Sequence, residues 1–392
     1  SCADVFAQSR PEFVVIDEQV DHGCHERRLG SLRTAGKMPA LLTRADCIRS
    51  GVRMNSRRPP NQMLHIHNGD SAAGTAKKSD IPGEHFAWLE ALVCGPAPGD
   101  LSPAEFRQVR AQHLADAYGA NLEKTVQELR AQEEKLARFS DHEEVVLWFE
   151  PDLFGQVQLI YLLDWFARHE LGRPRLSLIC INEFPGVEGF RGFGELSEEQ
   201  LATLFPQRQE LTQPQLDLGS KAWRAYSSSQ ANGLIAMLNS DTSALPFLRH
   251  ALSKHLQRFP WIGNGLGKVE RAGLDLVAKG FCNFKSLFPA FARREPEYGF
   301  GDAQFYLELK RLADAATPAL TLTVAGRRAA ADPAQMLLSS FEITDYGKAV
   351  LIGEEDFVRS NGIDHWLGGV HLLGSESPWR WDEEAQELLV SL

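Results

Sequence analysis

The chain has 392 residues, of which 43% are hydrophobic and 24% are charged, and this composition is typical of a soluble globular protein. No apolar run reaches the roughly 18 residues that a membrane-spanning helix needs, so we expect no membrane partner. The net charge is −11, and residues 63–392 carry −14 because residues 1–62 hold ten basic and seven acidic side chains. An acidic body repels a phosphate backbone, which argues against non-specific nucleic-acid binding.

Residues 1–62 show no sustained helical or strand periodicity and are rich in Arg and Pro. We interpret them as an extension that is not a domain. It is either a basic arm that binds a partner or the product of an upstream start codon, in which case the natural protein begins at Met63; we favour the second interpretation. The six cysteines of the whole chain are scattered without a C-x-x-C pair, which predicts reduced thiols and a cytoplasmic protein.

Residues 63–185 alternate between strand-like and helix-like segments, which predicts an α/β domain with a Rossmann-like, mainly parallel sheet. The expected strands are 64–67, 84–89, 145–149 and 176–181. Ser102-Pro103-Ala104-Glu105 is a capping box with Pro at the first helical position, so a helix is expected to follow it, with Phe106, Val109, His113, Leu114 and Ala117 on one face. Two further helices are expected at 121–138 and 153–169. The continuous apolarity of 145–149 is typical of a strand that is covered on both faces.

Acidic side chains follow three of these strands. Asp70 comes after the first strand, Glu150 and Asp152 after the third, and Glu183 after the fourth. The carboxyl ends of parallel strands share one edge of a sheet, where ligands bind. We therefore expect these four carboxylates to be candidate ligands of a hard cation such as Mg²⁺, with Asp70 and Glu150 also as candidate catalytic acid–base groups.

The same edge offers candidate ligand-binding residues, namely Asn68, Gly69, Ser71 and Asn182. A helix that begins near residue 72 points free N–H groups at an anion, so a phosphorylated or nucleotide-like small molecule is the expected ligand. The alternative for each residue alone is that Asp and Asn only cap the helices that follow the strands.

Two further motifs suggest other chemistry. Gly69-Asp70-Ser71 is similar to the nucleophile block of the Gly-Asp-Ser-type lipases and esterases, with Ser71 as the nucleophile. Those enzymes take their base from an Asp-x-x-His, which this chain lacks, so a serine hydrolase is a second alternative only. His65 and His67 alternate along the first strand, and we interpret them as ordinary strand positions because no third metal ligand lies near them in the sequence.

Residues 186–262 are expected to form a helical connecting region, which begins with a glycine-rich stretch at 186–194 and ends at Gly263-Asn264-Gly265. Residues 263–392 then have the element order of a winged helix. The expected helices are 269–278, 284–291 and 303–315, and the expected wing strands are 320–324 and 341–343.

The winged-helix-like region is not basic. Residues 266–356 contain 11 Lys and Arg against 13 Asp and Glu, and the helix in the recognition position offers only Lys310 and Arg311. Reading the major groove needs several such side chains, so we expect a protein partner or a homo-oligomer through this domain, while DNA stays open as the alternative. The aromatic residues Trp366, Trp379 and Trp381 are expected in a core or an interface.

Two stretches carry a resemblance to known families. Residues 63–74 (MLHIHNGDSAAG) resemble the opening of the bacterial domain-of-unknown-function family numbered 1835. Residues 366–370 (WLGGV) and 379–382 (WRWD) resemble the companion family numbered 3658. The resemblance implies a bacterial α/β protein with a C-terminal domain, and it implies no activity. The functional expectation is therefore a small-molecule-binding α/β protein, or alternatively a ligand-responsive regulator.

Overall fold

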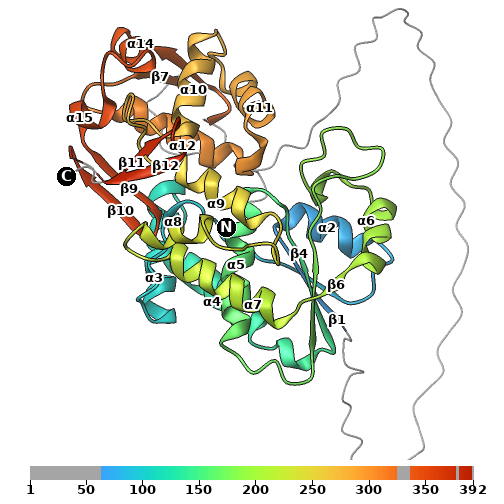
Figure 1. Cartoon of the computed structure of the whole chain (residues 1–392). Helices are drawn as coiled ribbons and strands as arrows, with labels where there is room; N and C mark the ends of the chain where they lie inside the picture. Colours follow the sequence, from blue (N-terminus) through green and yellow to red (C-terminus); the bar gives the residue numbers. More distant parts are fainter. Residues whose placement is uncertain (1–62, 325–335, 377–378, 391–392) are drawn as a thin grey trace, which may run out of the picture. The chain divides into compact units, whose positions relative to one another are not determined.

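A five-stranded sheet with the order β2-β1-β4-β5-β6 organises the first half of the protein (Figure 1). Its strands are β1 (Met63–His67), β2 (Glu84–Ala87), β4 (Glu144–Trp148), β5 (Arg175–Ile179) and β6 (Gln209–Glu210). The first four in this order run parallel, and only β6 is antiparallel to its neighbour. The prediction of a mixed α/β fold with a mainly parallel sheet is confirmed.

The structure, a computed structural model, describes residues 63–324, 336–376 and 379–390. The predictions for residues 1–62 therefore lie outside the described residues.

The sheet is covered on both faces, as the apolarity of the third predicted strand indicates. Because side chains alternate along a strand, Val145 and Leu147 of β4 face the large core, while Val146 and Trp148 face a smaller apolar cluster. The smaller cluster includes residues of α2 (Asp70–Lys78) and α6 (Glu198–Leu204), which Figure 1 shows together on one side of the strands.

The opposite face is covered by α5 (Leu153–Ala167), which is buried along most of its length and packs against α7 (Gln213–Tyr226). Gly219 allows the close approach of the two helices. A Cβ atom at this position would lie 2.5 Å from the Cβ of Leu163, so α5 fits against α7 only where a side chain is missing.

The helices α3 (Pro103–Tyr118) and α4 (Leu122–Leu136) pack on each other. The predicted capping box at the start of α3 is present: the Glu105 backbone N–H donates to Ser102 Oγ, and the Ser102 backbone N–H donates to Glu105 Oε2 at 2.9 Å. The expected buried face of α3 is only partly right. Leu114 is buried, but its buried neighbours are Arg110 and Tyr118 rather than Phe106 and Val109.

A buried irregular segment, residues 90–97, joins β2 to α3, and side chains from distant helices satisfy its carbonyl groups. Arg110 donates to the carbonyl oxygens of Ala91, Cys94 and Pro96 at 2.7–3.0 Å. Tyr226 Oη donates to Leu92 O at 2.9 Å, and Arg258 Nη1 donates to Val93 O at 2.6 Å. Buried backbone without such partners would be costly, so these side chains determine the path of the segment.

The second half of the protein is helical and then β-rich. Its helices are α8 (Asn232–Leu238), α9 (Leu248–Leu256), α10 (Lys268–Ala278), α11 (Phe284–Arg294), α12 (Asp302–Asp314), α14 (Asp345–Leu351) and α15 (Phe357–Asn361). Its strands form the antiparallel pairs β7 (Leu320–Val324) with β8 (Ser339–Ile343), β9 (Ile363–Gly368) with β10 (Val370–Gly374), and β11 (Trp379–Asp382) with β12 (Glu387–Val390). The helices α10, α11 and α12 and the strands β7 and β8 lie within a few residues of their predicted positions, whereas the strands β9 to β12 were not predicted. The described elements do not by themselves confirm a winged helix.

The two halves share one apolar core. The largest cluster of buried side chains extends from Leu64 to Leu388 and runs across the predicted boundaries at 185 and 262. A short strand, β3 (Gly95–Pro96), pairs with β9 and so joins the irregular segment to the C-terminal strands. Trp379 and Trp381 are buried in this core, whereas Trp366 is partly exposed and stacks on His371. Within the described ranges, no helix has the length and apolarity required to cross a membrane.

Candidate functional site

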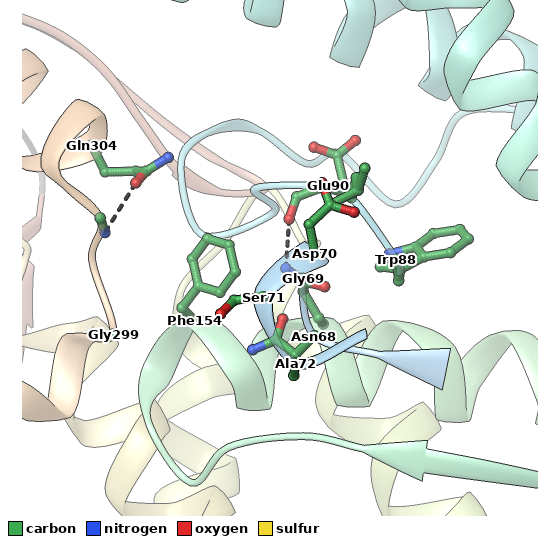
Figure 2. Close-up of a pocket in the computed structure, with 13 residues that line it drawn as sticks. Asn68, Gly69, Asp70, Ser71, Ala72, Trp88, Glu90, Phe154, Gly299 and Gln304 are labelled. Atoms are coloured by element: carbon green, nitrogen blue, oxygen red, sulfur yellow. Dashed lines mark hydrogen bonds between the residues drawn. The ribbon is translucent and has the colours of Figure 1, made fainter. Parts of the chain in front are cut away.

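A small pocket lies at the carboxyl end of β1, where the sequence predicts a site (Figure 2). Four segments line it: the turn from β1 into α2, the chain after β2, the first turns of α5, and the start of α12. The lining residues are Asn68, Gly69, Asp70, Ser71, Ala72, Trp88, Leu89, Glu90, Phe154, Gln158, Gly299, Gly301 and Gln304. Its volume is about 40 Å³, which is room for about three water-sized groups.

Asn68 and Glu150 meet behind this pocket, as the strand-edge prediction requires. Asn68 is 2% exposed, and its Nδ2 donates to Glu150 Oε2 at 2.7 Å. Glu150 is fully buried and also accepts, at Oε1, a hydrogen bond from the Phe193 backbone N–H at 3.3 Å. Asn68 lines the pocket, whereas Glu150 does not, so Glu150 holds Asn68 in place rather than facing the pocket itself.

Gly69, Asp70 and Ser71 form the wall that begins α2. Gly69 has a φ of 119°, which strongly favours glycine, and no side chain caps the helix that starts after it. Asp70 is half-buried, and burial raises the pKa of its carboxyl above the usual value, while Lys77 opposes the shift. The Ser71 side chain packs against Gly194, where a Cβ atom would lie 2.9 Å from Ser71 Oγ. The glycine-rich stretch therefore lies close to the site.

The other expected residues lie elsewhere. Asp152 caps α5, because its Oδ1 accepts from the Gly155 backbone N–H at 2.7 Å, so the capping alternative is confirmed for this residue. Asn182 and Glu183 follow β5 but have exposed side chains and do not line the pocket. Across the described part of the chain, no three His, Cys, Asp or Glu side chains gather where they could hold a metal ion. The structure thus does not bring Asp70, Glu150, Asp152 and Glu183 together as the predicted Mg²⁺ site requires. Glu150 bonds to Asn68 and to the Phe193 backbone, Asp152 caps α5, and the Glu183 side chain is exposed.

This arrangement predicts the response to Mg²⁺. We expect millimolar Mg²⁺ to change the melting temperature of the wild-type protein and of Asp70→Asn equally. Asp70 and Glu90 are the carboxylates of the described lining, and Glu90 is already paired with Arg110, so too few ligands are left for a cation. The substitution itself should change the free energy of unfolding by less than about 1 kcal/mol, because Asp70 contributes only its interaction with the helix dipole. Melting curves of both proteins with and without Mg²⁺ test this, and a response confined to the wild type would restore the metal site.

Sequence reasoning missed Trp88, Glu90, Gln158 and Gln304. Glu90 lies three residues beyond the end of β2, as Asp70 lies three residues beyond the end of β1, so the strand-end signal that identified Asp70 could also have identified Glu90. Gln158 is a polar residue inside an apolar helix, which is a usable signal for a site. Gln304 carries no such signal, since only tertiary packing brings the start of α12 to the sheet.

Polar atoms without partners gather at the pocket. Asn68 Oδ1, Gln158 Oε1 and Trp88 Nε1 are all buried and have no hydrogen-bond partner within the described residues. Gln158 is itself held in place, because its Nε2 donates to the Glu90 carbonyl oxygen at 2.5 Å. Leaving a buried polar group unsatisfied costs about 1–3 kcal/mol, so three of them around one pocket indicate a place for a polar occupant.

A separate cluster of histidines lies under α2, on the face of the sheet that carries Trp148. His85 of β2 joins His65 and His67, so the cluster contains a third histidine that sequence spacing did not reveal. His67 Nε2 lies 3.0 Å from His85 Nδ1, and Trp148 Nε1 donates to His65 Nδ1 at 3.1 Å. Burial lowers the pKa of all three, and that of His65 falls to about 4. These are neutral histidines that bond to each other and to the backbone, in agreement with the interpretation of His65 and His67 as strand positions.

A comparison with models of known protein families found no match to this chain. A search of curated proteins also found no match. The resemblance to the families numbered 1835 and 3658 stays a prediction.

Proposed function

We propose that the protein binds a small polar molecule in the pocket at the carboxyl end of β1. The observation that carries the proposal is the convergence of three buried, unsatisfied polar atoms, those of Asn68, Trp88 and Gln158, on that pocket. Protein interiors satisfy such groups with water or a ligand, and a concave site with a few convergent polar groups is the usual form of a ligand site.

The location supports the same proposal. Ligands of open parallel sheets bind outside the carboxyl ends of the strands, and this pocket lies at the end of β1 beside the N-terminus of α2. If the protein is an enzyme, Asp70 is its candidate acid–base group, because it lines the pocket and burial raises its pKa. Glu150, the other candidate, is engaged by Asn68 and would act only by positioning it.

The size of the pocket argues against a whole nucleotide in this conformation. Sites for drug-sized ligands measure roughly 300–1,000 Å³, whereas this pocket measures about 40 Å³. A phosphorylated ligand would therefore place one group inside and the rest at the mouth. A thermal-shift screen of nucleotides, sugar phosphates, small amines and polyols tests the proposal, because any ligand that prefers the folded state raises the melting temperature.

A matched pair of substitutions locates the response. Gln156 and Gln158 are both buried on α5 and both donate to a backbone carbonyl, but only Gln158 lines the pocket. We expect Gln158→Met to weaken binding of any compound found in the screen by about tenfold or more, as loss of one hydrogen bond to a buried group predicts. Gln156→Met should bind as the wild type does. Equal affinities in all three proteins would place the ligand elsewhere and contradict the proposal.

A specific observation favours a ligand-responsive regulator as the second candidate. Gly301 and Gln304, at the start of α12, line the pocket, and α12 occupies the recognition position of the proposed winged helix. Its basic residues Lys310 and Arg311 pair with Asp314 and Glu270, so the helix offers little to DNA and a protein partner or self-association is the better proposal. Gel-shift and light-scattering measurements, each with and without a ligand from the screen, test this; an unchanged mass and no shift would argue against it.

The hydrolase alternative gains no support from the site. None of the described residues that line the pocket is a histidine, so no base is positioned for Ser71.

A further inference from the structure

We propose that the pocket recognises a primary ammonium group that carries a neighbouring oxygen atom, as in an amino alcohol. This inference rests on the proposed function and names the chemical class of its ligand. It departs from the phosphorylated ligand that the helix N-terminus suggests, because two of the three unsatisfied, buried side-chain atoms of Asn68, Trp88 and Gln158 are hydrogen-bond acceptors.

The orientation of the two amides establishes the acceptors. Asn68 directs its nitrogen to Glu150, because its Nδ2 donates to Glu150 Oε2 at 2.7 Å. Gln158 must likewise direct its nitrogen to the Glu90 carbonyl oxygen. The atoms left toward the pocket are therefore both oxygens, and neither has a donor among the described residues. Two buried acceptors need a ligand with at least two N–H or O–H donors.

The charges of the lining agree with a cation. Asp70 and Glu90 are the ionisable side chains of the described lining, and none of the lining residues is Lys, Arg or His. Arg110 neutralises Glu90 from behind, with Nη2 at 2.7 Å from Oε1, so Asp70 contributes most of the net charge. The N-terminus of α2 carries partial positive charge, and Asp70 in its first turn already neutralises part of this charge. The helix end therefore attracts a phosphate group less strongly.

The remaining lining atoms define the rest of the ligand. Trp88 Nε1 is a donor without a partner in the described chain, and it suits a hydroxyl or carbonyl oxygen next to the ammonium group. Phe154 supplies an apolar surface for a short carbon chain (Figure 2). A volume of about 40 Å³ admits an ammonium group and a neighbouring atom or two, with any larger substituent at the mouth.

The experiment is a calorimetric and thermal-shift titration of the full chain with ethanolamine, choline, ethylene glycol and inorganic phosphate. Ethanolamine should bind and raise the melting temperature. Choline should not, because its quaternary nitrogen keeps the charge but has no N–H donor, and ethylene glycol should bind at least about tenfold more weakly because it lacks the charge.

Two variants test whether ethanolamine binds through Gln158 and Asp70. Gln158→Met should weaken ethanolamine binding by about tenfold or more, and Asp70→Asn should weaken it several-fold at low salt and less at high salt. Asp80→Asn, just beyond α2 and outside the pocket, is the matched control for charge and should bind as the wild type does.

Three outcomes would overturn the inference. If phosphate binds in a manner that depends on Gln158 while ethanolamine does not, the ammonium assignment is wrong and the pocket still binds a ligand. If choline binds as well as ethanolamine, the pocket does not recognise the N–H donors of the ammonium group. If neither these probes nor the wider screen bind in a Gln158-dependent manner, the proposed function fails together with this inference.

Discussion

Replacing Arg110 with methionine is expected to lower the free energy of unfolding by about 3–5 kcal/mol, the cost of removing one partner from a buried ion pair. Arg110 is fully buried and pairs with Glu90, which is 5% exposed. The substitution would leave a buried carboxylate beside the pocket without its cation, and it would remove the donors of the Ala91, Cys94 and Pro96 carbonyl groups.

Urea denaturation of the variant at pH 7 gives the measurement. Arg107→Met is the matched control, because Arg107 lies one turn earlier on α3 and pairs with Glu133 nearer the surface. Its cost should stay below about 1 kcal/mol. The double variant Arg110→Met/Glu90→Gln should recover part of the loss, since it removes the unpaired charge. A cost below about 1.5 kcal/mol for Arg110→Met would show that the segment 90–97 does not depend on this residue.

The buried histidines should make the protein sensitive to mild acid. Burial, reinforced by the neighbouring His85, lowers the pKa of His65 from 6.5 to about 4. Both of its ring nitrogens have partners when the ring is neutral, since Trp148 donates to Nδ1 and Nε2 donates to the Pro82 carbonyl oxygen. Between these two pKa values the unfolded chain binds a proton that the folded protein does not bind, so stability is full above about pH 6.5 and falls as the pH decreases.

The expected size follows from the pKa of His65. Between pH 7 and pH 5 this one group should lower the free energy of unfolding by about 2 kcal/mol. His67 and His85, whose pKa values are also lowered, add to the loss. Urea denaturation at a series of pH values should therefore show that His65→Gln loses about 2 kcal/mol less than the wild type over this interval.

The stability difference between the wild type and His65→Gln above pH 7 serves as the control. Above pH 7 the two proteins should differ in stability by an amount that does not change with pH, because the ring is neutral in both the folded and the unfolded state. Equal losses of stability below pH 6.5 in the wild type and in His65→Gln would contradict a neutral, buried His65.

Local patterns in the sequence were sufficient for the parallel strands of the main sheet and for the helices between them, and they indicated the edge of the sheet at which the pocket lies. The apolar run around Val146 predicts a strand covered on both faces, and the residues Ser102 and Glu105 predict the start of α3. Asn68 and Asp70 were predicted at the carboxyl edge because the end of a parallel strand places its next residues there, and both line the pocket. Each of these inferences needs only the neighbours of a residue along the chain, which is the information that periodicity and capping contain.

The tertiary structure alone decided which side chains meet at that edge. Apolar spacing assigned the buried face of α3 to Phe106 and Val109, but Arg110 is the buried residue because its partners, the carbonyl groups of the segment 90–97, are not visible in the helix pattern. Gln304 reaches the pocket from a helix more than 200 residues further along the chain than Asn68, through packing that no local motif encodes. Glu183 follows its strand as Asp70 does, yet it faces solvent, because a strand end determines the edge of the sheet and not the direction of the side chain that follows.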